Sequence, residues 1–129
     1  MADQSLIVLI EPKAARHQHA DILGRAGFKV ASIAAEEFDL ARVLEQGPAV
    51  VAAELDGAGS ATLNLAKQFR QTPQARLIPF IIYGHQLRSQ DIENAARAGA
   101  LWLQLEPGDG NRLVAAVRGL IAASRDDGR

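Results

Sequence analysis

Three glutamates, Glu11, Glu54 and Glu106, each follow directly on five mainly apolar residues, and this is the pattern in the sequence most suited to chemistry. Short apolar runs are typical of buried strands. The carboxyl ends of parallel strands meet at one edge of a sheet, where open α/β folds bind ligands. We therefore expect the three carboxylates to converge on a single site at that edge.

Such an acidic edge has more than one interpretation. The glutamates are either solvated residues at strand ends, or a cation site that also uses Asp56 and His85. Like charges that are held together take up a proton or recruit a counter-ion, so both interpretations are physically sound.

The elements that would position these residues alternate along the chain. The expected strands are residues 6–10, 29–33, 49–53, 79–83 and 101–105, and the expected helices are residues 13–26, 35–46, 60–71, 90–98 and a last helix capped by Asp109. Right-handed crossovers between such units give a parallel sheet with helices on both faces. We predict a flavodoxin-like (βα)5 doubly wound sheet with strand order 2-1-3-4-5.

Composition restricts the class of protein. The 129 residues predict one domain over residues 1–123, and residues 124–129 are a polar tail or the start of a linker. The net charge of −1, from 14 basic and 15 acidic residues, favours neither nucleic acid nor membrane binding. The chain has no cysteine, no apolar run near the roughly 18 residues of a membrane span, and no basic start of a signal peptide. We expect a cytoplasmic protein.

Several framework positions have a characteristic order and spacing. They are Arg16, Gly27, Phe28, Pro48, residues 78–82, residues 98–100 and Pro107. Through these positions the chain resembles the CheY-like receiver domain of bacterial two-component response regulators, over essentially its whole length. The resemblance implies a place in phosphorelay signal transduction.

The resemblance also implies where phosphoryl-transfer residues would stand, and these positions are altered. The two acidic residues that hold Mg²⁺ in a receiver correspond to Ile10 and Glu11. The phospho-accepting aspartate corresponds to Glu54, and the lysine that pairs with the phosphoryl oxygens corresponds to Glu106, which reverses the charge.

The switch positions implied by the resemblance are altered as well. The hydroxyl residue that follows the phosphoryl group corresponds to Gly84, and the aromatic switch residue corresponds to Leu103. A further interpretation makes Glu54 a permanent imitation of a phosphorylated aspartate. Gly84 has no hydroxyl to detect that charge, however, and Leu103 lacks the aromatic ring that would report it.

These changes argue against phosphoryl transfer. That reaction depends on positioning and on cations that neutralise developing charge. Mg²⁺ demands strict oxygen geometry, and the loss of one comparable electrostatic stabiliser costs about 10²–10³ in rate. We expect a pseudo-receiver with no catalytic residues, no metal and no other cofactor, and hence not an enzyme.

The histidines give weaker signals. His17 and His19 are two residues apart and diverge on a helix. His19 falls on the apolar face of the expected first helix, which indicates a packed residue more than a ligand. His85 follows the fourth strand at the functional edge.

Trp102 is the candidate anchor of an interface, since tryptophan is enriched in interaction hot spots. Arg97 and Arg118, with Arg88 and Arg112, fall on helices expected to border the fifth strand, so we predict a basic rim there. The alternative is a Trp102 packed beneath the last helix.

The function predicted from the sequence is a phosphorylation-independent interaction or regulatory module. Its partner would be a histidine kinase, an effector domain or a second copy of the chain. The alternatives are a working response regulator phosphorylated at Glu54 or Asp56, and a small-ligand or ion sensor that uses the acidic pocket.

Overall fold

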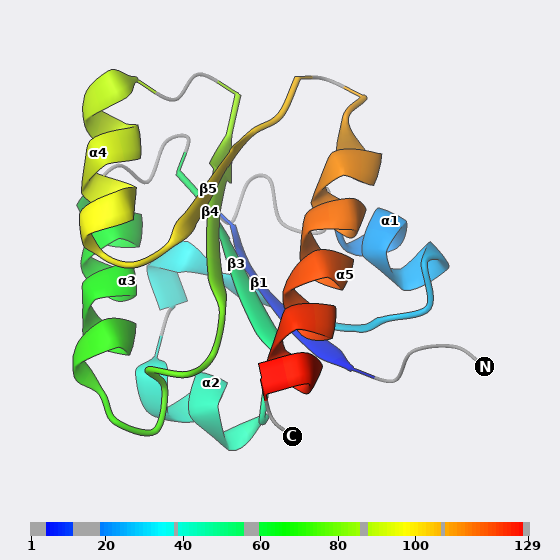
Figure 1. Cartoon of the computed structure of the whole chain (residues 1–129), viewed down its shortest axis with the longest axis horizontal. Coiled ribbons are helices and arrows are strands. Elements are labelled where there is room, and N and C mark those ends of the chain that lie inside the picture. The colour runs from blue at the N-terminus through cyan, green and yellow to red at the C-terminus, as the bar shows by residue number, and fades with distance from the viewer. Residues whose placement is uncertain are drawn as a thin grey trace.

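A computed structural model describes residues 5–11, 19–37, 39–55, 60–85, 88–106 and 108–127 of the chain. These residues form a five-stranded parallel sheet with helices on both faces (Figure 1). The strand order is β2-β1-β3-β4-β5. The predicted flavodoxin-like topology is therefore confirmed.

The strands fall close to the predicted segments. Their bounds are β1 Leu6–Glu11, β2 Lys29–Ala34, β3 Val50–Glu54, β4 Phe80–Gly84 and β5 Leu101–Gln104. β1, β3 and β4 are mainly apolar runs without polar alternation, as buried parallel strands are, while the edge strands β2 and β5 are partly exposed and include polar residues. β3 lies in the middle of the sheet, between β1 and β4. The strand ends that carry Glu11 and Glu54 are consequently adjacent.

The helices differ more from the prediction. They are α1 Ala20–Arg25, α2 Leu40–Glu45, α3 Ser60–Gln71, α4 Ser89–Arg97 and α5 Gly110–Asp127, with a 3-10 turn η2 at Ala35–Glu37. Only part of the predicted helix 13–26 can be compared, because residues 12–18, including Arg16 and His17, lie outside the described residues. α5 continues through Asp127, into the segment predicted as a polar tail. No helix within the described parts of the chain combines the length and apolarity of a membrane span.

The prediction of one continuous helix over residues 35–46 is wrong. Asp39 interrupts it in an extended conformation, with φ −143° and ψ 114°, and its Oδ1 accepts a 3.0 Å hydrogen bond from the Ala41 N–H. An aspartate that satisfies an unpaired N–H in this way starts a new helix. The cap thus divides the segment into a 3-10 turn and the short α2.

Two apolar layers hold the helices to the sheet. α1 and α5 cover one face, called here the α1/α5 face, and α2, α3 and α4 cover the other (Figure 1). Successive strand residues point to opposite faces, so Ile10 packs in the α2/α3/α4 layer and Leu9 in the α1/α5 layer. By the same alternation Glu11 lies on the α1/α5 face.

Candidate functional site

Glu11 is the centre of a buried polar group at the end of β1. Glu11 is only 1% exposed. The Tyr83 hydroxyl donates a 2.5 Å hydrogen bond to Glu11 Oε2, and His19 Nδ1 lies 2.8 Å from the same oxygen. The His19 and Tyr83 rings meet edge to face, with centroids 5.0 Å apart. Glu11 thus joins β4 and the residue that precedes α1 to the end of β1.

Glu54 completes this group from the middle strand. It is 4% exposed, and it is the register partner of Tyr83 in the β3–β4 ladder. Glu11, His19 and Glu54 each offer one potential ligand atom, and these atoms all lie within 4.8 Å of one another. We call these three residues the Glu11–His19–Glu54 cluster. The convergence predicted for Glu11 and Glu54 is therefore confirmed.

One oxygen of the cluster is unsatisfied. Glu11 Oε1 is buried and without a hydrogen-bond partner among the described residues. A buried acceptor left in that state is costly, and two carboxylates held this close repel each other when both are ionised.

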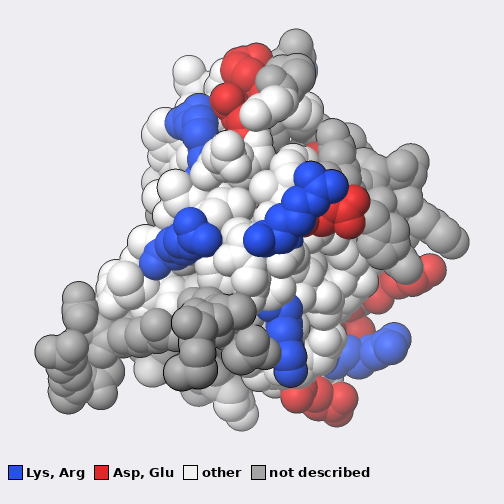
Figure 2. Space-filling view, turned by 90° about the vertical axis from the view of Figure 1, so that its right-hand side faces the viewer, with Lys and Arg blue, Asp and Glu red and all other residues white. Residues whose placement is uncertain are grey.

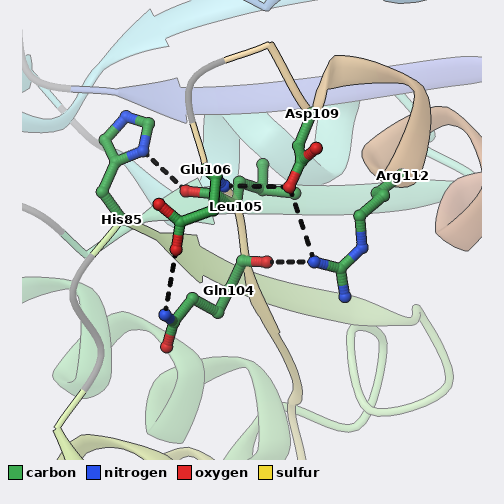
Figure 3. Close-up of polar contacts among 6 residues, drawn as sticks. All are labelled: His85, Gln104, Leu105, Glu106, Asp109 and Arg112. Carbon is green, nitrogen blue, oxygen red and sulfur yellow. Dashed lines mark hydrogen bonds and ion pairs between the residues drawn. The ribbon is translucent and has the colours of Figure 1, made fainter.

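Glu106 does not join the cluster, and the prediction that three glutamates converge is wrong for this residue. The Glu106 side chain is exposed and accepts a 3.4 Å hydrogen bond from Gln104 Nε2. Its N–H donates to Asp109 Oδ2 at 3.1 Å, and Arg112 Nη1 lies 3.6 Å from that oxygen and donates to the Gln104 carbonyl at 2.8 Å. Figure 3 shows this separate network after β5.

The alternation of side chains along β5 explains the separation. Leu103 and Leu105 pack with the α1/α5 layer, the face on which Glu11 lies. Trp102 and Gln104 fall on the opposite face, and one more step of the same alternation takes Glu106 with them. The side chain of Glu106 therefore leaves the strand end away from the two buried glutamates.

The prediction that His85 contributes to a cation site is also not supported by its position. His85 Nδ1 donates a 2.6 Å hydrogen bond to the Leu105 carbonyl, beside the Glu106 network (Figure 3). The other residue proposed for that site, Asp56, lies outside the described residues. The histidine that does reach the carboxylates is His19, which the sequence indicated only as a packed residue; it is 7% exposed and hydrogen bonded as well.

The other described positions implied by the receiver resemblance take part in packing or in backbone hydrogen bonds. Ile10 is buried in the α2/α3/α4 layer. The Gly84 carbonyl accepts a 2.9 Å hydrogen bond from the Leu105 N–H, and Leu103 packs partly buried against the α1/α5 layer. Pro107, a framework position, lies outside the described residues.

The donor set does not fit Mg²⁺. That ion requires near-ideal octahedral oxygen coordination and keeps several waters. The cluster offers an imidazole nitrogen in place of an oxygen ligand. All three residues are also at least nine-tenths buried, which leaves little room for bound water.

The exposed end of β5 is the second candidate region. β5 is an edge strand, and its Leu101 and Trp102 are 43% and 42% exposed. Trp102 is therefore not packed beneath the last helix. Arg97 pairs with Glu93 on the surface of α4, with Nη2 2.7 Å from Oε1.

Arg118 does not border this region as predicted. Its Nη2 donates a 3.2 Å hydrogen bond to the Ala26 carbonyl, and its guanidinium lies 5.9 Å from the centroid of the Phe28 ring. Arg118 therefore caps the turn after α1, and it lines a groove there with Arg25. Figure 2 shows separate basic side chains on a largely uncharged surface at this side of the molecule.

Comparison with known proteins gives matches among solved structures only, since no protein-family model and no curated protein matches the chain. A chemotaxis response regulator, CheY4 of Vibrio cholerae, superimposes with a TM-score of 0.76 and 16% identity, over 92% of this chain and 99% of that one. A putative response regulator from Chloroflexus aurantiacus gives 0.78 and 20%, over 93% and 99%. A CheY-like receiver domain protein from Methanospirillum hungatei gives 0.79 and 15%, over 97% and 99%. The chain has the fold of response regulator receiver domains.

Proposed function

We propose that the chain is a receiver-like module of two-component signalling that works by protein–protein interaction and without phosphoryl transfer. The observation that carries this proposal is the state of Glu54, the residue at the phosphoacceptor position. Glu54 is 4% exposed and lies against Glu11 and His19. An acceptor must reach an incoming phosphodonor, and this carboxylate is covered.

The side chains that would hold or supply cations for phosphoryl transfer are also replaced at the corresponding positions. Ile10, at one Mg²⁺ position, is an apolar residue of the core. Glu106, at the lysine position, is a carboxylate held in its own surface network. Charge that develops on a transferring phosphoryl group would therefore meet negative side chains instead of the cations that stabilise it.

The interaction surface of this proposal is the exposed edge at β5. Trp102 presents apolar area on an edge strand, on the sheet face that α4 with its Arg97 also covers, and the neighbouring Leu101 is exposed on the same strand. Partly exposed aromatic residues of this kind act as anchors in protein interfaces. The partner would be a histidine kinase, an effector domain or a second copy of the chain.

The proposal can be tested with beryllium fluoride and Mg²⁺, which together imitate a phosphorylated receiver. We expect the amide NMR spectrum of the full chain to remain unchanged on their addition. A phosphorylation-competent receiver domain under the same conditions is the positive control. Shifts that centre on residues near Glu54 or Asp56 would instead support the alternative of a working response regulator.

A further inference from the structure

The two edges of the sheet differ in how their backbone groups are covered. β2 and β5 are the edge strands. On β5 the Gln104 carbonyl accepts a 2.8 Å hydrogen bond from Arg112 Nη1, so a side chain covers that edge. Proteins commonly cover sheet edges, because unpaired N–H and C=O groups there pair readily with a further strand. Among the described residues, β2 has no such cover.

The open backbone groups of β2 belong to Val30 and Ser32. The Lys29 N–H donates to the Ser5 carbonyl, on the β1 side, at 3.1 Å. Backbone groups of successive strand residues point to opposite edges, so Val30 and Ser32 direct theirs away from β1. Neither residue has a hydrogen bond on that side within the described parts of the chain. Ala34 follows in the alternation but is only 1% exposed, so the open edge ends before it.

A groove of about 310 Å³ lies beside this open edge. It is lined by residues 31–34 of β2 and by Glu37, Arg42 and Gln46. Glu37 ends η2 and Arg42 belongs to α2, so the groove lies at the break that the Asp39 cap produces. A strand added to β2 therefore has room for its side chains on this face.

We propose that β2 pairs in antiparallel fashion with β2 of a second copy of the chain and joins the two sheets into one. This contact lies at the opposite edge from β5 and goes beyond the proposed function. A twofold axis at Ala31 places Val30 of one copy opposite Ser32 of the other. These two residues then exchange both of their backbone hydrogen bonds, as a hydrogen-bonded antiparallel pair does.

Burial at both ends of the open edge selects this register. A shift in one direction would pair Val30 with the buried Ala34. A shift in the other direction would pair Ser32 with Phe28, which is 5% exposed and whose N–H already donates to the Leu23 carbonyl. Only the register centred on Ala31 uses the open groups of Val30 and Ser32 alone.

Charge and shape in the groove favour a second copy as the occupant. The register places Lys29 of each copy opposite Ile33 of the other, on the face that contains the groove. Lys29 is exposed and Ile33 is half-buried, so the alkyl chain of the lysine covers the isoleucine. The lysine ammonium then enters a groove that contains the Glu37 carboxylate. The twofold axis produces this complementary contact twice.

The test is sedimentation velocity of the full chain from about 10 μM to 1 mM, the range of weak association. We expect a reversible monomer–dimer equilibrium. Ser32→Pro should raise its dissociation constant at least about tenfold, because each copy loses one intermolecular hydrogen bond. Proline is tolerated on an edge strand where the N–H faces solvent, so the domain should stay folded. Ser32→Ala keeps the N–H and is the matched control, with dimerisation as in the unaltered chain.

A chain that remains monomeric at about 1 mM would overturn the proposal. So would equal dimerisation of Ser32→Pro, or an equal loss in Ser32→Ala. If Ser32→Pro does not fold, amide hydrogen exchange of the unaltered chain decides, because exchange at Val30 and Ser32 must slow as the concentration rises. A dimer that protects the Trp102 amide instead would place self-association at β5, which overturns this proposal and leaves the proposed function in place.

Discussion

The Tyr83 hydroxyl lies 2.5 Å from Glu11 Oε2, although the two residues are 72 positions apart in the chain and belong to strands that do not pair. β3 runs between them and brings Glu54 into the same buried space. The end of the sheet is thereby a connected polar group, not a row of independent solvated side chains. Changes at one member should therefore affect the others.

Tyr83→Phe should destabilise the domain by about 1–3 kcal/mol, because it removes a donor from a buried carboxylate and leaves the ring in place. Urea denaturation measures the free energy of unfolding. The control repeats the change in a Glu11→Leu background, where the acceptor is already gone and the cost should largely disappear. An equal cost in both backgrounds would mean that the hydrogen bond has no energetic role.

Glu106→Lys should change the free energy of unfolding by no more than about 0.5 kcal/mol, as is usual for exposed positions. If the three glutamates converged as the sequence predicted, this change would stabilise the domain through an ion pair with Glu54 or Glu11. The structure removes that expectation, because Glu106 is exposed and bonded to Gln104. A stabilisation well above 1 kcal/mol in urea denaturation would place Glu106 beside the buried carboxylates after all.

Trp102→Ala should leave the domain folded and should weaken its association with a partner or with itself. Trp102 is 42% exposed, so its truncation removes less core than Leu113→Ala, a fully buried comparison expected to cost about 2–5 kcal/mol. Thermal melting by circular dichroism checks the fold, and sedimentation velocity checks self-association. If Trp102→Ala unfolds as readily as Leu113→Ala, Trp102 is a core residue and the interface lies elsewhere.

Asp39→Ala should cost about 1 kcal/mol, because it removes the acceptor of the Ala41 N–H at the start of α2. Asp39→Asn keeps a capping oxygen and is the matched control, with a much smaller loss expected. Urea denaturation of both variants measures the difference. Equal stability of Asp39→Ala and the unaltered chain would show that α2 does not depend on this cap.

The pattern of strands along the sequence predicted both the sheet and the proximity of Glu11 to Glu54. Uninterrupted apolar runs define parallel strands, and strand order then brings Glu11 and Glu54 together regardless of their separation in the chain. Glu106 could not be placed in this way, because its direction depends on where β5 ends and on a hydrogen bond to Asp109. A shift of one residue moves a side chain to the other face.

His19 and Tyr83 were missed as site residues because each also fits a packing position. His19 falls on the apolar face of the helix predicted over residues 13–26, and Tyr83 lies within the buried strand β4. Their polar atoms acquire a role only through Glu11, which lies 8 positions from His19 and 72 positions from Tyr83 in the chain. Tyr83 did carry one signal, since it stands one residue before Gly84 at the same sheet edge as Glu54.

The most direct test of the pseudo-receiver account is the intact mass of the full chain after incubation with a small-molecule phosphodonor and Mg²⁺. The account predicts an unchanged mass, while a phosphorylation-competent receiver domain treated alongside gains a phosphoryl group. A gain of one phosphoryl group by this chain would contradict the account. Its loss in Glu54→Gln or in Asp56→Asn would then identify the acceptor.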